Sequence, residues 1–227
     1  MALDKADYVK GLRAKFVIQR GRSGKQNTLS TCGCCLMEQN CYAVAAWRRF
    51  FKTEKDIKRV IELGTGRGGW SYVLNEECKK YDIEFRTFEL YPEKCEACEK
   101  HGFVCELIPP DLFGFNPDGQ DRLAESAGNQ PMKEIVAEEG RTVLLVDSAY
   151  RMEVIEYLFE YMKPNDIVAT HDYARTAPFG QRIMRAQNIW RSNGMQLKHF
   201  TRLNLPLDEY RPMLFWRAAW GVFLVNK

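Results

Sequence analysis

A glycine-rich turn preceded by an acidic residue is the part of this sequence with the clearest capacity for chemistry. Residues 64–69 read Gly-Thr-Gly-Arg-Gly-Gly, and Glu62 stands two positions before them. The glycines at 64, 66 and 69 satisfy the G-x-G-x-x-G pattern, in which backbone N–H groups approach a cofactor at the N-terminus of a helix. The turn therefore predicts a cofactor site, while its spacing alone leaves the cofactor class open.

Acidic residues recur further along the chain, separated by about one strand and one helix. Glu89 could accept hydrogen bonds from both hydroxyls of a ribose, and Asp111 follows it. Asp147 and the pair His171-Asp172 come later. Carboxylate and imidazole groups that meet at one place can hold a divalent metal or move a proton. Asp147, His171 and Asp172 are therefore the candidates for catalysis.

Strand-length apolar runs alternate with helix-length amphipathic segments from Lys58 onward, which predicts a parallel sheet built from βαβ units. The expected strands are residues 59–63, 83–88, 104–108, 142–146 and 167–170. The expected helices are residues 70–80, 92–101, a segment within 123–139, 152–162 and 179–193. Each candidate residue follows an expected strand closely, at the edge where open α/β sheets bind their ligands.

Two further strand-like runs, at 196–203 and 215–225, fit an antiparallel hairpin at the edge of the sheet. The expected fold class is therefore α/β, a Rossmann-like, doubly wound, seven-stranded sheet, mostly parallel with a C-terminal antiparallel hairpin. Residues 56–227 would form this domain, and residues 1–55 an N-terminal helical extension. Its helices are expected at 4–13 and 36–51, with a Gly/Ser-rich break at 21–30.

The string from Glu62 to Gly68 resembles motif I of the class I S-adenosylmethionine-dependent methyltransferases. An acidic residue here suits a sulfonium cofactor, which carries an ammonium group and a positive sulfur, whereas it would repel the pyrophosphate of a dinucleotide. In that family the residues at the third strand end contact the adenine ring. The resemblance implies a cofactor site made of Glu62, Gly64, Thr65, Gly66, Gly68, Glu89, Leu90, Asp111, Leu112 and Asp147.

The ends of the fourth and fifth expected strands resemble those of metal-dependent O-methyltransferases of the catechol, macrolide-sugar and cephalosporin-biosynthesis types. In these families acids or amides at such positions hold one Mg²⁺ against two oxygens of the substrate. The resemblance implies that Asp147, His171 and Asp172 are both the catalytic residues and the metal ligands. Histidine would favour another divalent metal over Mg²⁺. His171 could instead be a general base, or could merely hydrogen-bond Asp147 or the backbone.

A second likeness concerns residues 67–71, since Arg-Gly-Gly-Trp-Ser is similar to a segment of viral RNA cap 2′-O-methyltransferases. Those enzymes use a Lys-Asp-Lys-Glu tetrad, which cannot be assembled here because His171 occupies the place of a lysine. Arg151, after the fourth expected strand, and Trp220, in the last expected strand, are interpreted as surface or packing residues.

The composition of the chain indicates which binding partners and which cellular compartment to expect. Lys and Arg number 33 against 30 Asp and Glu, and a net charge of +3 does not favour nucleic acid as a partner, although it does not exclude it. No apolar stretch reaches the length of a membrane span, and no signal peptide is evident. The protein is therefore expected to be cytoplasmic, without a membrane partner and with homo-oligomerisation left open.

The 8 cysteines are interpreted as reduced thiols, as expected for a protein that is not exported. Cys95, Cys98 and Cys105 form one sequence group. A second group lies at positions 32, 34, 35 and 41. A zinc site shared by the two groups is an alternative, although the spacing matches no regular zinc motif.

The sequence thus predicts an enzyme of the EC 2.1.1 class that transfers a methyl group from S-adenosylmethionine to an oxygen of a small hydroxyl-bearing molecule, with or without Mg²⁺ or another divalent metal. The alternatives are a non-catalytic Rossmann-like binding or assembly protein, an RNA 2′-O-methyltransferase, and a nicotinamide-dependent oxidoreductase, which the glycine pattern alone would also fit.

Overall fold

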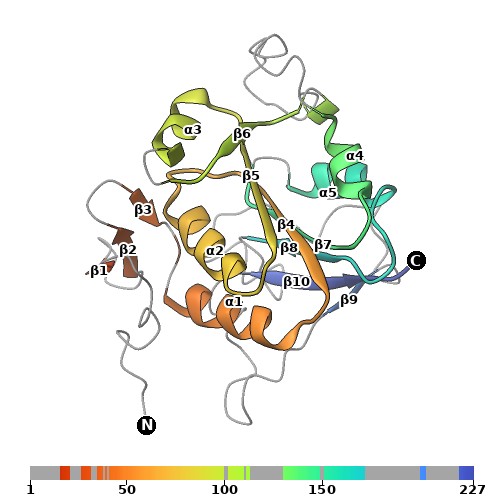
Figure 1. Cartoon of the computed structure of the whole chain (residues 1–227), viewed down its shortest axis with the longest axis horizontal. Helices are drawn as coiled ribbons and strands as arrows, with labels where there is room; N and C mark the ends of the chain where they lie inside the picture. Colours follow the sequence, from red (N-terminus) through yellow and green to blue (C-terminus); the bar gives the residue numbers. More distant parts are fainter. Residues whose placement is uncertain are drawn as a thin grey trace, which may run out of the picture.

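The computed structural model describes residues 16–20, 27–31, 35–37, 39, 41–99, 102–109, 111–112, 130–148, 151–171, 200–202 and 220–227. A large mixed sheet forms the centre of this part of the chain, with helices on both of its faces (Figure 1). A small antiparallel sheet of β1 (Phe16–Arg20), β2 (Asn27–Thr31) and β3 (Cys35–Met37) lies beside it.

The large sheet has the strand order β6-β5-β4-β7-β8-β10-β9. Its strands are β4 (Ile57–Leu63), β5 (Glu84–Glu89), β6 (Cys105–Leu107), β7 (Arg141–Val146), β8 (Ile167–Thr170), β9 (Phe200–Arg202) and β10 (Gly221–Val225). The first five in this order pair in parallel, whereas β10 is antiparallel to both β8 and β9. The chain builds outward from β4 on one side and from β7 on the other, so the topological switch point lies between these two strands.

Five helices cover the sheet, namely α1 (Cys41–Thr53), α2 (Gly69–Lys79), α3 (Pro92–Glu99), α4 (Met132–Ala137) and α5 (Arg151–Phe159), counted over the described residues. One apolar cluster joins α1 and α2 to the sheet, with Trp47, Phe50 and Trp220 fully buried at its centre. A second cluster joins α4 and α5 to the opposite face. This two-sided cover confirms the doubly wound arrangement.

Local sequence explains why the central elements were predictable. The run Arg141–Val146 ends in four successive apolar residues, and these four and Thr142 before them are buried, as parallel strands with both faces covered require. Pro92 occupies the first turn of α3, and Gly102 follows that helix with a φ of 77°. The mostly parallel sheet with a C-terminal antiparallel pair is confirmed, with strand ends within two residues of expectation for β4 to β8.

Other boundaries differ from expectation. The helix expected somewhere within 123–139 is confirmed by α4, whereas α5 ends at Phe159 rather than at 162. The strand expected at 215–225 is described only from Gly221, and the helix expected at 179–193 lies outside the described residues.

The N-terminal region is not simply helical, which corrects the sequence prediction. Three strands precede α1, and β2 occupies part of the expected break at 21–30. The segments Phe-Val-Ile-Gln-Arg and Asn-Thr-Leu-Ser-Thr are rich in β-branched residues, which favour strands over helices. The helix expected at 36–51 begins at Cys41 and ends at Thr53, and the one expected at 4–13 lies outside the described residues. None of the described helices has the length and apolar character needed to cross a membrane.

Candidate functional site

The glycine turn leaves β4 at the switch point of the sheet and leads into α2. Gly64 follows the last residue of β4 with a φ of 101° and lies directly against the end of β7. A β-carbon at Gly64 would stand 2.5 Å from the carbonyl oxygen of Asp147, so only glycine fits this crossing. The backbone N–H of Asp147 donates to the carbonyl of Leu63 at 2.8 Å. The turn and the end of β7 are thus fixed to each other.

Gly66 is held by the carboxylate at the end of the neighbouring strand. Its N–H donates to Oε2 of Glu89 at 2.7 Å, and Oε1 of Glu89 accepts from the N–H of Leu90 at 2.9 Å. Glu89 is only 4% exposed, and the Lys94 ammonium lies 3.5 Å from Oε1. A β-carbon at Gly66, by contrast, would meet no atom within 4 Å. The turn therefore presents open backbone next to a carboxylate whose orientation is fixed.

Glu62 is buried beneath the turn and not exposed along it. Its Oε2 accepts from the hydroxyls of Ser71 at 2.5 Å and Thr87 at 2.6 Å. Burial raises the pKa of Glu62 to about 8, because the two hydroxyl hydrogen bonds only partly offset the loss of water and the charge of Asp147 acts in the same direction as burial. Glu62 is therefore a buried acid whose ionised form would be stabilised by a nearby positive charge.

Thr65 and Gly68 complete the turn. The Thr65 hydroxyl lies 2.5 Å from that of Thr87 and 3.3 Å from the Cys105 sulfur. Gly68 precedes α2 with a φ of 76°, and its carbonyl accepts from the N–H of Tyr72 at 2.9 Å, which starts the helix. The N-terminus of α2 is thereby directed toward the turn, as in other cofactor sites of open sheets.

Asp111 and Leu112, expected at the adenine ring, have structural contacts. The Asp111 carboxylate accepts from the N–H groups of Met132 at 2.9 Å and Lys133 at 3.2 Å, and so caps α4. The Tyr157 hydroxyl lies 3.3 Å from the same carboxylate. Leu112 is 4% exposed and belongs to the apolar cluster under α4 and α5. Contact of these two residues with an adenine ring stays a prediction.

Asp147 and His171 meet at the carboxyl ends of adjacent strands, as the sequence predicts. Oδ1 of Asp147 lies 3.1 Å from Nδ1 of His171 and 2.7 Å from Nη2 of Arg151. Burial would raise the pKa of Asp147, but the charges and hydrogen bonds of His171 and Arg151 outweigh it and hold this pKa below its ordinary value. Asp147 is therefore an ionised group that orients the histidine ring. Asp172 lies outside the described residues.

Gln39 and Trp220 support this pair from opposite parts of the sequence. Nε2 of Gln39 donates to Oδ2 of Asp147 at 3.3 Å, and Nε1 of Trp220 donates to Oε1 of Gln39 at 3.0 Å. The Trp220 ring also lies against that of His171, with 5.0 Å between ring centroids. Sequence reasoning missed Gln39 as a site residue and assigned Arg151 and Trp220 to packing or surface. No local pattern connects positions so far apart.

The metal site expected from Asp147, His171 and Asp172 stays a prediction, because Asp172 lies outside the described residues. Oδ1 of Asp147 is in contact with Arg151 at 2.7 Å and with His171 at 3.1 Å. Among the residues that the structure describes, no group of three His, Cys, Asp or Glu side chains is arranged to hold a metal ion.

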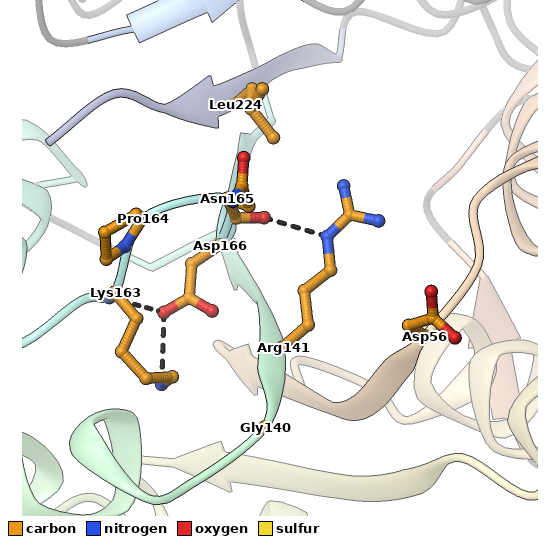
Figure 2. Close-up of a pocket in the computed structure, with 8 residues that line it drawn as sticks. All are labelled: Asp56, Gly140, Arg141, Lys163, Pro164, Asn165, Asp166 and Leu224. Carbon is orange, nitrogen blue, oxygen red and sulfur yellow. Dashed lines mark hydrogen bonds and ion pairs between the residues drawn. The ribbon is translucent and has the colours of Figure 1, made fainter.

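A hollow of about 490 Å³ lies at the opposite end of the sheet from the glycine turn (Figure 2). Its polar groups are engaged with each other, since Arg141 donates to the Asn165 carbonyl at 2.8 Å and Lys163 pairs with Asp166 at 3.1 Å. Arg141 also donates to the Lys55 carbonyl and to Glu54. The hollow lies at the amino ends of β7 and β8, away from the glycine turn, and its contacts indicate a structural role.

The sequence matches no protein-family description and no curated protein. Among solved structures, a candidate caffeoyl-CoA O-methyltransferase from Staphylococcus aureus superposes with a TM-score of 0.50 at 12% identity, over 80% of this chain and 82% of the other. The S-adenosylhomocysteine-bound methyltransferase PaMTH1 of Podospora anserina gives 0.47 at 13% identity, over 98% and 93%. A methyltransferase from Thiobacillus denitrificans with the same ligand gives 0.41 at 14%, over 80% and 89%. The first of these likenesses shows that the chain shares the Rossmann-like α/β fold of that O-methyltransferase-like structure.

Proposed function

We propose that this protein binds S-adenosylmethionine and transfers its methyl group to a hydroxyl oxygen of a small molecule. The single observation that carries the proposal is the geometry of the turn. Open backbone at Gly66 lies beside the buried, anchored carboxylate of Glu89, at the switch point of the sheet. Ligands of open α/β sheets bind at this point, beyond the carboxyl ends of the strands.

The acidic residues favour a cationic cofactor. Glu62 and Glu89 are both almost completely buried from solvent. Among the described residues, Lys94 forms an ion pair with Glu89. A pyrophosphate at this turn would be repelled by the Glu89 carboxylate, whereas the ammonium and sulfonium of S-adenosylmethionine would be attracted to it, and a nearby cation would favour the ionised form of Glu62. Oε1 of Glu89 accepts from Leu90, Tyr91 and Lys94, whereas Oε2 accepts from Gly66 alone among the described residues, so Oε2 could still accept from a ribose hydroxyl.

S-adenosylmethionine, when bound, supplies an electrophilic methyl group on a positive sulfur. The chain's part is to position the acceptor hydroxyl and remove its proton. With Nδ1–H donated to Asp147, the histidine tautomer carries its lone pair on Nε2, which can accept that proton. The new bond joins the acceptor oxygen to the methyl carbon, the carbon–sulfur bond breaks, and the proton ends on His171.

Asp147 and Trp220 are positioning residues in this scheme. Asp147 fixes the tautomer of His171 and stabilises the imidazolium that forms, as the acid does in other Asp–His pairs. Trp220 packs against the ring of His171, and Arg151 keeps Asp147 ionised. The arrangement accounts for a base at the end of β8 without a metal.

The proposal is tested by titration calorimetry of the purified protein with S-adenosylhomocysteine. Saturable binding is expected, with no binding of NAD under the same conditions. Glu89→Gln should weaken binding about tenfold or more, because a charged acceptor of hydrogen bonds is lost. Glu106→Gln, which breaks only the surface pair with Arg86, is the matched control and should bind as the wild type does. Absence of binding by folded wild-type protein would refute the proposal.

Methyl transfer is then followed with labelled S-adenosylmethionine and a panel of small alcohols, phenols and catechols. Transfer to any of them supports the acceptor class. Binding without transfer to small molecules or RNA would favour a non-catalytic binding protein on the same scaffold.

A further inference from the structure

Three thiols meet behind the glycine turn. Cys95 and Cys98 stand three positions apart on α3, so they share one face of that helix, and they face Cys105 at the start of β6. All three are buried, with exposed fractions of 8%, 0% and 8%, and all are free thiols. The ring of Phe103 packs with them. Neither the cofactor site nor the proposed mechanism uses this cluster.

Two of the sulfurs are nearly in bonding position. The Sγ atoms of Cys95 and Cys105 are 2.6 Å apart, whereas a disulfide bond measures about 2.05 Å. Closing the bond would therefore need a movement of roughly half an ångström. Cys95 lies near the middle of α3 and Cys105 at the start of a strand, so a small shift of the helix would be enough.

Cys105 is the thiol best suited to react first. Its sulfur lies 3.3 Å from the Thr65 hydroxyl, and Cys95 and Cys98 are hydrogen-bonded to it. Hydrogen bonds from Cys95, Cys98 and Thr65 and the charge of Lys94 lower the pKa of Cys105 against the opposing effect of burial. Thiolate is the form that attacks oxidants, and the exposed 8% of Cys105 offers access to a small one.

The cluster is connected to the cofactor turn. Thr65 lies between Gly64 and Gly66, and its hydroxyl contacts both Cys105 and Thr87. The first turns of α3 also carry Lys94, 3.5 Å from the Glu89 carboxylate that holds the turn. A disulfide would remove the thiolate charge beside the Thr65 hydroxyl and draw α3 toward β6, so both supports of the turn would change.

We infer that Cys95 and Cys105 form an oxidation site, at which a small hydroperoxide produces a reversible disulfide that weakens cofactor binding. The Cys105 thiolate attacks the peroxide, the O–O bond breaks, and a sulfenic acid forms with release of hydroxide or alkoxide. The Cys95 sulfur then attacks this sulfenic sulfur, and hydroxide leaves. With two protons from the thiols, two thiols and hydrogen peroxide give one disulfide and two waters. A dithiol reductant reverses the product by exchange.

The effect on the cofactor rests on the proposed function, whereas disulfide formation does not. The first readout is therefore chemical. Full-length protein is treated with hydrogen peroxide, blocked with an alkylating agent, digested with trypsin without reduction and analysed by mass spectrometry. The expected product joins peptide 95–100 to peptide 101–122 with loss of two hydrogen atoms.

Peptide 95–100 contains both Cys95 and Cys98, so two variants assign the bond. Cys98→Ala should keep the crosslink, and Cys95→Ala should lose it. Cys78→Ala, which removes a buried thiol outside the cluster, is the control and should keep it. A crosslink that needs Cys98 instead of Cys95, or oxidation of Cys105 to sulfinic acid alone, would overturn the assignment.

The second readout is the affinity for S-adenosylhomocysteine before and after oxidation. Oxidised wild type should bind at least fivefold more weakly, with recovery after dithiothreitol, and Cys95→Ala should be insensitive to peroxide. A crosslink with unchanged affinity would overturn the coupling. Absence of binding by the reduced protein would refute the proposed function instead and leave the disulfide result standing.

Discussion

Gly64 approaches Asp147 so closely that a β-carbon on the glycine would lie 2.5 Å from the carbonyl oxygen of the aspartate. The contact is between two backbones, so no side-chain rotation can relieve it. It joins the cofactor turn directly to the residue that orients His171. The proposed cofactor turn and the proposed base are therefore positioned by one rigid crossing at the centre of the sheet.

Replacing this glycine with alanine should be costly. Gly64→Ala is expected to destabilise the protein by about 3 kcal/mol or more, because a backbone clash adds to the strain of a positive φ. Gly102→Ala is the matched control, since Gly102 also has a positive φ (77°) but a β-carbon there meets no atom within 4 Å. It should cost only about 1 kcal/mol. Urea unfolding followed by circular dichroism measures both, and equal costs would contradict the close crossing.

The buried Glu62 should make stability depend on pH. Its pKa rises from 4.5 to about 8 on folding, so below pH 4.5 both states hold the proton and between these values only the folded state does. The contribution of Glu62 to the free energy of unfolding therefore falls as pH rises from about 4.5 to 8 and is constant above that.

Glu62→Gln removes this titration. As pH rises from 5 to 8.5, the free energy of unfolding of the variant should increase by about 3 to 5 kcal/mol relative to that of the wild type. The reason is that a tenfold change in proton affinity corresponds to about 1.4 kcal/mol. Urea unfolding at several pH values gives the difference between the two proteins. A difference that stays constant with pH would show that Glu62 is ionised throughout.

The proposed base should affect turnover without affecting cofactor binding. His171→Gln is expected to lower kcat by roughly 10²- to 10⁴-fold, the usual contribution of general-base catalysis, while the Kd for S-adenosylhomocysteine changes less than twofold. Asp147→Asn should also lower kcat, since it removes the charge that fixes the histidine tautomer. A wild-type kcat in His171→Gln would exclude the histidine as the base.

The residues that line the hollow at the amino ends of β7 and β8 should contribute to stability and not to methyl transfer. Arg141→Met removes hydrogen bonds to the carbonyls of Asn165 and Lys55 and to Glu54, and should cost about 1 to 3 kcal/mol. Methyl transfer and cofactor affinity should be unchanged at temperatures well below the unfolding midpoint. Loss of transfer by folded variant protein would indicate that this edge takes part in function.

The sequence predicted the parallel core well because its signals are local. The last four residues of β7 are one continuous apolar run, and the glycines of the turn are spaced for a known geometry. Asp147 and His171 were placed together for the same reason, since parallel strands bring their carboxyl ends to one edge.

Non-local contacts explain what the sequence did not reveal. Gln39 bonds to Asp147 across 108 positions, and no pattern in a single sequence marks such a pair. Asp111 occupies the expected strand end, but its carboxylate caps a helix 21 positions later, which depends on the path of the intervening chain. The strands before α1 were missed because short β-branched runs were outweighed by nearby glycine and serine.

The hydrogen bond from Trp220 to Gln39 closes a loop of 181 positions. Both groups of this bond are buried, with Trp220 at the centre of an apolar cluster, so the bond should open only when the core itself unfolds. Cofactor binding and methyl transfer should therefore be lost together as the temperature rises.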